Sequence, residues 1–172
     1  DPVDPIKPVS IEAFAYRVPI ATPVKVSFGT FRDRPMVLVR IVDAGGTEGW
    51  GEIWCNWPAV GAEHRARLVQ GVLAPLATSR PFDDPPAAFD FLTSATAVLA
   101  LQSGEPGPFA QAIAGVDLAL WDLQARRAQQ PLWRFLGGTT PRVRVYASGL
   151  NPDRPADLAA KCRNEGFRAF KL

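Results

Sequence analysis

The spacing of the apolar residues changes twice along this chain, and that change limits the folds that the chain can adopt. Apolar positions alternate with a period of two before Pro58. From there to about Ala128 they recur every three or four positions, as in helices that bury one face. A short alternating pattern returns at Arg142. An order of strands first and helices afterwards predicts an α+β layer arrangement.

Three strands are predicted before Pro58, and we expect them to form an antiparallel sheet. They cover residues 9–18, 36–42 and 47–53. Asp43-Ala44-Gly45-Gly46 is a turn sequence that joins the last two strands as a hairpin. Pro19 and Pro23 end the first strand, so residues 21–34 are predicted to be a connecting loop. This loop has an unusual content of apolar residues, so we expect it to cover another part of the protein.

Three helices are predicted to pack on this sheet. The first carries apolar residues at Val69, Val72, Leu73 and Leu76 and is closed by Pro75 and Pro81. The second begins at Pro85 or Pro86, and the third runs from Phe109 to about Ala128.

The pattern of residues 142–172 predicts a strand, a helix that stops at Gly166, and a second strand. This is one βαβ unit, which by itself leaves two strand edges unpaired. We therefore expect the chain to be the first part of a larger α/β protein.

Composition excludes several classes of protein. Hydrophobic residues make up 47% and charged residues 21% of the 172 positions, as in globular proteins. The 19 Lys and Arg are scattered and nearly balanced by 17 Asp and Glu, so we expect no nucleic-acid partner. No apolar run approaches the roughly 18 residues of a membrane span and the N-terminus lacks a signal-peptide pattern, so we expect no membrane partner and a cytoplasmic protein. Cys55 and Cys162 are far apart and are expected to be free thiols.

Four segments carry a resemblance to a known family. They are Gly49-Trp50-Gly51-Glu52, the run AIAGVDLALWDLQAR at residues 112–126 with Pro131-Leu132 and Leu136-Gly137-Gly138 after it, Val145-Tyr146-Ala147-Ser148-Gly149, and Gly166-Phe167-Arg168-Ala169-Phe170-Lys171-Leu172. Together they resemble the N-terminal portion of the mandelate racemase and muconate lactonizing enzyme group of the enolase superfamily. Phe135 departs from the pattern, since the family usually has Leu there.

The resemblance implies two domains. Residues 1–140 would form an α+β capping domain, and residues 141–172 the first strand-helix-strand of a TIM-like barrel whose remainder is absent. In this family three carboxylates on successive barrel strands hold Mg²⁺, and the metal stabilises the enediolate formed when a base removes the α-proton of a carboxylate substrate. We expect no metal ligand within this chain, and we expect the 172-residue chain alone to be inactive. We also expect a homo-oligomer.

Two residues of the barrel segment are candidates for the active site. Phe167, Ala169 and Lys171 share one face of the last predicted strand. The resemblance implies that Lys171 is the first lysine of the family's Lys-x-Lys motif and binds the substrate carboxylate beside the second lysine, which is the base; the alternative is an ordinary lysine at a frayed strand end. Ser148 follows the first barrel strand and by resemblance also contacts the substrate carboxylate; the alternative is a turn-forming serine before Gly149.

Six further candidates belong to two loops that, by resemblance, fold over the barrel mouth and select the substrate. They are Val24, Val26 and Phe28 in the first loop and Trp54, Asn56 and Trp57 in the second. Closure of such loops would exclude water from the site. The alternative interpretation is that apolar side chains simply tuck under a loop.

Three other polar residues are not taken as candidates for the active site. His64 lies in the first turn of a predicted helix beside two charged residues and is expected to be a solvated surface residue. Asp117 and Asp122 are five positions apart on a helix, face different directions and are expected to be structural.

The leading hypothesis for function is a Mg²⁺-dependent racemase or epimerase that acts on a small-molecule carboxylate. A dehydratase acting on an acid sugar or a hydroxy acid is the alternative within the enzyme class, because the same enediolate can lose a β-hydroxyl. An alternative from a different class is a non-catalytic α+β interaction module that uses its aromatic loops to bind a protein.

Overall fold

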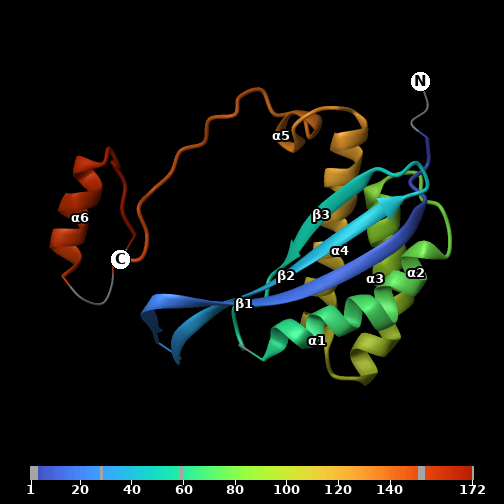
Figure 1. Ribbon diagram of the computed structural model, residues 1–172, viewed down its shortest axis with the longest axis horizontal. Helices are drawn as coiled ribbons and strands as arrows, with labels where there is room; N and C mark the ends of the chain where they lie inside the picture. Colours follow the sequence, from blue (N-terminus) through green and yellow to red (C-terminus); the bar gives the residue numbers. More distant parts are fainter. Residues whose placement is uncertain (1–3, 28, 59, 151–153, 172) are drawn as a thin grey trace.

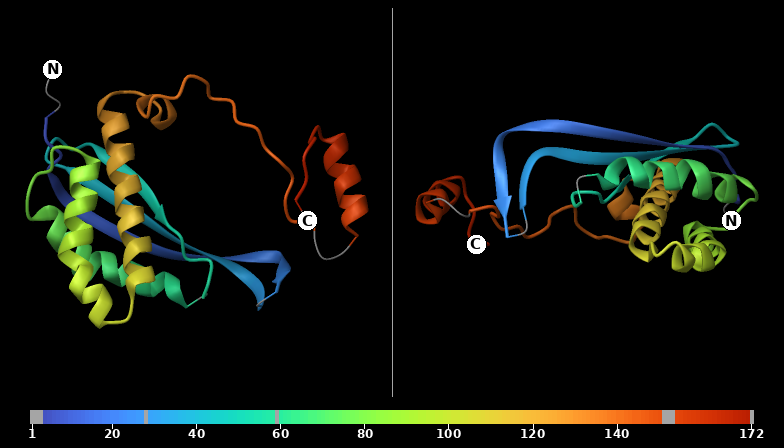
Figure 2. Two further views of the ribbon diagram at one scale, coloured as in Figure 1. Left: turned by 180° about the vertical axis from the view of Figure 1, so that it is seen from behind. Right: turned by 90° about the horizontal axis from the view of Figure 1, so that it is seen from below.

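A three-stranded antiparallel sheet forms one layer of the main body of the protein. The computed structural model describes residues 4–27, 29–58, 60–150 and 154–171. The strands β1 (Pro8–Val26), β2 (Gly29–Asp43) and β3 (Glu48–Ile53) pair in the order β1-β2-β3. The helices of the main body cover one face of this sheet (Figure 1; Figure 2, right). The predicted α+β layer arrangement is therefore confirmed.

The central strand shows why the period-two pattern identified the sheet. Val37, Val39 and Ile41 are fully buried, at 0% exposure, and alternate with half-exposed neighbours. Val39 pairs with Ala13 of β1 and with Gly51 of β3. Every second side chain of β2 therefore points into the layer between the sheet and the helices.

The predicted loop at residues 21–34 is wrong, because this segment is part of the sheet. Val24 pairs with Phe31 and Val26 with Gly29, so β1 and β2 continue past the end of β3 as a two-stranded ribbon. We call residues 18–26 and the described residues 29–34 the β-arm. A register shift between Pro19 and Val24 accommodates the prolines, which lack the backbone N–H that a regular ladder needs. The β-arm extends beyond the helices and bends near its tip (Figure 2).

The first helical run is longer than predicted. Helix α1 (Gly61–Leu68) continues through one π-helical turn, η1 (Val69–Leu73), into α2 (Ala74–Thr78). Pro75 does not close the run, because it directly follows the π-helical turn, where the regular i→i−4 hydrogen bonding is already interrupted. The buried face is as predicted, since Val69 and Leu73 are fully buried.

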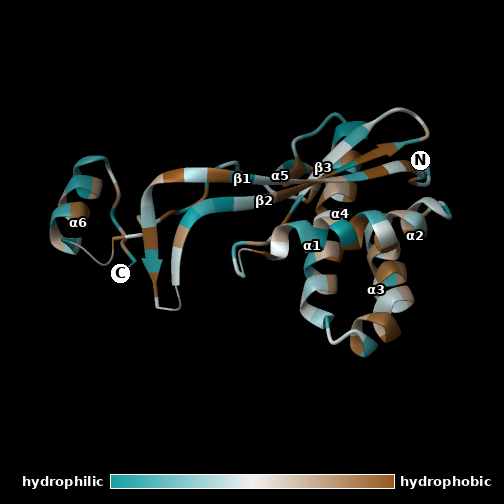
Figure 3. Ribbon diagram, turned by 60° about the horizontal axis from the view of Figure 1, so that its bottom comes forward, coloured by the Kyte–Doolittle hydropathy of each residue, from teal (hydrophilic) through white to brown (hydrophobic). Residues whose placement is uncertain are grey.

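The two long helices match their predicted segments. Helix α3 (Pro85–Gln102) begins after Asp84, whose carboxylate accepts a hydrogen bond of 2.8 Å from the N–H of Ala87. Helix α4 (Pro106–Arg127) begins three residues before the predicted start. Helix α4 packs on β3 and β2, and α1 and α2 pack on β1, whereas α3 packs mainly on α4. The prediction that the second helix lies on the sheet is therefore wrong, and α3 carries exposed apolar residues (Figure 3).

A buried ion pair joins the ends of three segments. The Asp43 side chain at the end of β2 is 1% exposed and accepts a hydrogen bond of 2.7 Å from Nε of Arg127. The backbone N–H of Thr47 donates to the other carboxylate oxygen of Asp43 at 2.8 Å. Arg127 also donates to the carbonyl of Asp4 at 3.1 Å. The carboxylate is thereby paired and hydrogen-bonded, as a buried charge requires.

The C-terminal part lies apart from the main body (Figure 1). After α5 (Leu132–Phe135) the chain runs extended to residues 142–150, and α6 (Pro155–Asn164) follows. The two predicted strands are reduced to one parallel bridge between Ala147 and Phe170, because within the described residues neither segment has a second strand to complete a ladder. The predicted helix is confirmed and ends before Gly166, whose φ of 103° suits glycine.

Candidate active site

The parallel bridge places Ser148 and Lys171 next to each other in register. The N–H of Ala147 donates to the carbonyl of Ala169 at 2.9 Å, and the N–H of Lys171 donates to the carbonyl of Ala147 at 2.8 Å. Ala147 is therefore opposite Phe170, and the next residues along the two segments, Ser148 and Lys171, are opposite each other.

The same register indicates which face these two residues occupy. The Phe170 ring lies on the side of α6, with the Arg163 guanidinium 5.9 Å from its centre. Ala147, opposite Phe170, is buried. Because successive side chains of an extended segment point to opposite faces, Ser148 and Lys171 belong to the face away from α6. Both are exposed in the described chain.

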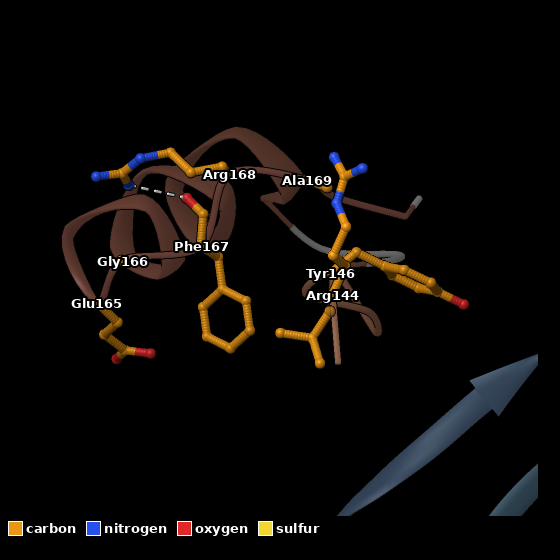
Figure 4. Close-up of a pocket in the computed structure, with 8 residues that line it drawn as sticks. Arg144, Tyr146, Glu165, Gly166, Phe167, Arg168 and Ala169 are labelled. Atoms are coloured by element: carbon orange, nitrogen blue, oxygen red, sulfur yellow. Dashed lines mark hydrogen bonds between the residues drawn. The ribbon is translucent and has the colours of Figure 1, made fainter. Parts of the chain in front are cut away.

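A hollow of about 610 Å³ lies nearby but does not contain the two candidate residues. Its lining comes from residues 144–146 and 165–169, which precede Ser148 and Lys171 along their segments. Arg168 donates to the carbonyl of Phe167 at 3.1 Å beside it (Figure 4). Since neither Ser148 nor Lys171 lines it, we assign this hollow no catalytic role.

The structure brings the two candidate capping segments into contact. The rings of Phe31 in the β-arm and Trp57 meet edge to face, with centroids 5.6 Å apart. The Trp57 ring also lies against Gly29, where an added Cβ would be 2.9 Å from Cη2 of the indole. Val24 pairs with Phe31 and is 37% exposed. The β-arm reaches toward the end of the molecule that holds residues 142–150 and 154–171 (Figures 1 and 2).

The other candidate residues that the structure describes lie at the tip of the β-arm and along residues 54–57. Val26 pairs with Gly29 at the tip of the β-arm and is exposed. Trp54 is 53% exposed, and Asn56 is half-buried. Phe28 lies outside the described residues.

An ion pair anchors the root of the β-arm to the first turn of α1. Arg17 donates from Nε to Oε1 of Glu63 at 2.8 Å and from Nη2 to Oε2 at 2.6 Å. Asp33 lies 3.7 Å from the same guanidinium. The hydrogen bond from Arg17 is the main cause that lowers the pKa of the Glu63 carboxyl, and it raises the pKa of Arg17.

Asp122, Asp117 and His64 are the polar residues that were not taken as candidates for the active site. Asp122 accepts hydrogen bonds from the N–H of Trp50 at 2.8 Å and from Arg126 at 2.7 Å, which ties β3 to α4. Desolvation by burial raises the pKa of Asp117. His64 is not a fully solvated residue as expected, because its Nε2 atom lies 2.8 Å from a carboxylate oxygen of Glu105, which the fold brings near from another segment.

Both thiols are free, as predicted. Cys55, between Trp54 and Asn56, is buried, and desolvation by burial is the main cause that raises its pKa. Burial therefore keeps Cys55 in its less reactive thiol form.

Metal-binding and membrane-spanning features are not seen in the described part of the chain. Among residues 4–27, 29–58, 60–150 and 154–171, no three His, Cys, Asp or Glu side chains converge as ligands. These residues do not fit a Mg²⁺ site. No helix within the same ranges has the length and apolarity needed to cross a bilayer.

Sequence reasoning missed the residues that organise the capping segments. Arg17 and Glu63 are 46 positions apart, and no local pattern links them. Gly29 and Phe31 were assigned to a loop, although the alternation of Val24, Val26 and Phe31 with polar residues could have indicated strands on either side of a turn.

The fold and these motifs define a class of protein, the enolase-type capping domain. Residues 9–137 match the family described as "Mandelate racemase / muconate lactonizing enzyme, N-terminal domain". The chain belongs to the mandelate racemase and muconate lactonizing enzyme family. The resemblance inferred from the four sequence segments is thereby confirmed.

Individual relatives agree with this family. A crystal structure of a mandelate racemase/muconate lactonizing enzyme from Bordetella bronchiseptica RB50 is 56% identical, with a TM-score of 0.88, over 98% of this chain and 43% of that one. A racemase from Streptomyces coelicolor with bound magnesium is 31% identical, with a TM-score of 0.77, over 95% of this chain and 45% of that one. The 3,6-anhydro-alpha-L-galactonate cycloisomerase of Streptomyces coelicolor is 30% identical over 91% of this chain and 43% of its own length.

The chain spans less than half the length of these relatives, between 43% and 45%. The match to the family's N-terminal domain covers residues 9–137. The relatives' remaining residues have no counterpart among residues 1–172.

Proposed function

We propose that the complete protein removes the α-proton of a small-molecule carboxylate and returns a proton to the opposite face, as a racemase or epimerase. In this proposal, residues 1–140 form the cap and residues 141–172 begin a barrel. Family membership supports a reaction of this superfamily, and the racemase and cycloisomerase names of two relatives favour an isomerase.

The observation that carries the proposal is the register of Ser148 and Lys171. Both residues belong to the face away from α6, at the carboxyl ends of two parallel segments. In an α/β barrel the helices lie outside, so that face would line the lumen, and its carboxyl end is where active sites lie. A hydroxyl and an ammonium group side by side there would suit a substrate carboxylate.

Each candidate residue then has a role. The Lys171 ammonium would hold one carboxylate oxygen by a charge-assisted hydrogen bond, and the Ser148 hydroxyl would donate to the other. Val24, Val26 and Phe28 of the arm region and Trp54, Asn56 and Trp57 of the following segment would cover the bound substrate and exclude water.

We infer that Mg²⁺ is the cofactor of the complete protein, which the magnesium-bound racemase from Streptomyces coelicolor supports. When bound, this ion would supply positive charge that stabilises the enediolate. Its ligands would come from outside residues 1–172, in keeping with the family resemblance.

A dehydratase of an acid sugar or a hydroxy acid is the second candidate. It needs the same α-proton abstraction and the same contacts from Lys171 and Ser148. The two outcomes differ in whether a β-hydroxyl leaves, so product analysis separates them.

Exchange of the substrate α-proton with solvent deuterium tests the proposal. The complete protein with Mg²⁺ is incubated in D₂O with a panel of hydroxy acids and acid sugars, and loss of the α-proton signal is followed by NMR. We expect exchange with at least one acid. Lys171→Met should lower the exchange rate by roughly 100-fold or more. The 172-residue chain alone should show no exchange.

Lys161→Met is the matched control, because Lys161 lies on α6 and its loss leaves the Ser148–Lys171 face unchanged. Full exchange by Lys171→Met, or equal losses in both variants, would contradict the assigned roles.

A further inference from the structure

The β-arm needs support from outside its own two strands. The pairing of β2 with β3 ends at Val37 and Ile53, so beyond this point the described residues of β1 and β2 pair as strands only with each other. A two-stranded hairpin is only marginally stable in water. A contact that covers apolar surface on the β-arm therefore has a large effect on its order.

Trp57 provides such a contact. Among the described residues of the β-arm, Phe31 alone is buried, with 8% exposure. Trp57 meets the Phe31 ring edge to face and lies against Gly29, so one indole covers two residues of β2. Gly29 permits this approach, because a side chain at that position would collide with the indole.

The root of the β-arm and the part beyond the root are held by different interactions. Its root is anchored by the exposed ion pair of Arg17 with Glu63. Exposed ion pairs contribute little and are screened by salt. Between the root and the tip, the apolar contact of Trp57 supports the ribbon where β3 no longer does.

We propose that Trp57 is a positioning residue that holds the β-arm, so that the β-arm and residues 54–57 form a single lid. The role as a lid over substrate depends on the proposed function. The positioning itself does not, because it follows from the contacts of Phe31 and Gly29.

Hydrogen exchange of the full chain, read by mass spectrometry on peptides of the β-arm, tests the proposal. In Trp57→Ala we expect amide exchange in the β-arm to rise about tenfold, as suits the loss of an aromatic pair together with its buried area. Peptides from α4 should exchange as before, and Trp57→Phe should restore most of the protection.

Trp54→Ala is the matched control, because Trp54 is in the same segment and is 53% exposed. Unchanged protection of the β-arm in Trp57→Ala would overturn the proposal, and so would an equal loss in Trp54→Ala. If Trp57→Ala fails to fold, Gly29→Ala replaces it, since its new methyl group pushes the indole away and should produce the same local rise.

A kinetic measurement distinguishes the positioning role from the proposed function. In the complete protein, Trp57→Ala should raise KM for the exchanging carboxylate more than it lowers kcat, because the chemical groups are intact. If the unaltered complete protein exchanges no acid, the proposed function fails while the hydrogen-exchange result stands. If exchange occurs and Trp57→Ala leaves KM unchanged, the single lid is disproved.

Discussion

The pairing of Arg17 with Glu63 shows how one residue can depend on a distant part of the chain. Both nitrogen–oxygen distances, 2.8 and 2.6 Å, fit a bidentate pair. The carboxylate is bound only in the folded state, because its partner is 46 residues away. The pKa of Glu63 is therefore lower in the folded chain than in the unfolded chain.

This difference predicts a loss of stability in acid. The contribution of Glu63 is complete above its ordinary pKa of 4.5 and is lost as the pH falls through the lowered folded value. Hydrogen exchange, corrected for the pH dependence of the intrinsic rates, measures the effect. In Glu63→Gln we expect the amide protection of the β-arm root to depend less on pH between about pH 5 and pH 3 than in the unaltered chain.

Glu52→Gln is the control for this measurement, because Glu52 is an exposed carboxylate of β3. A pH dependence that is the same in Glu63→Gln and in the unaltered chain would contradict the assignment.

At the scale of elements, glycines determine how closely α4 approaches β3. A Cβ at Gly51 would collide with the carbonyl oxygen of Gly115 and lie 2.7 Å from the N–H nitrogen of Ala119. At Gly49 it would collide with the carbonyl oxygen of Ala119. The side chain of Ile53 occupies the space that a Cβ of Gly115 would need. The Gly-Trp-Gly segment is thus a packing surface for the helix.

Gly51→Ala should therefore destabilise the fold. The clash is with helix backbone, which cannot rotate away, so we expect a loss of about 2–3 kcal/mol in the free energy of unfolding. Urea denaturation followed by circular dichroism measures it.

Gly71→Ala provides the comparison, since a Cβ there meets nothing within 4 Å. Its effect should stay within about 1 kcal/mol, with stabilisation allowed because alanine favours helix. Equal changes in the free energy of unfolding for Gly51→Ala and Gly71→Ala would show that the close approach of α4 to β3 is not needed for stability.

At the scale of the whole molecule, Asp43 and Arg127 join the N-terminal segment, the sheet and the end of α4. Removal of the arginine would leave a carboxylate that is 1% exposed without its partner. We expect Arg127→Ala to lower the free energy of unfolding by about 3 kcal/mol, as measured by urea denaturation.

The neighbouring Arg126 is the control for that prediction. It is 54% exposed and pairs with Asp122 four residues earlier. Arg126→Ala should cost less than about 1 kcal/mol. If Arg127→Ala lowered the free energy of unfolding no more than Arg126→Ala does, the ion pair of Asp43 would not be needed for stability.

Local patterns were sufficient for most elements of the fold. Strand β2 was evident from the alternation of buried Val37, Val39 and Ile41, and the start of α3 from Pro85 and Pro86. The family could also be inferred, because its signature lies in continuous segments such as residues 112–126. The prediction failed at residues 21–34, where prolines suggested a loop but an edge strand accommodates them at a register shift.

The sequence by itself determined the order of strands and helices, their buried faces and the family, because each depends on residues close together in the chain. Only the tertiary structure decided that α3 packs mainly on α4, that Ser148 lies opposite Lys171, and that Trp57 covers Phe31. These features depend on contacts between residues that are far apart in sequence. Local propensity does not specify such pairs, because each forms only when the chain brings separate segments together.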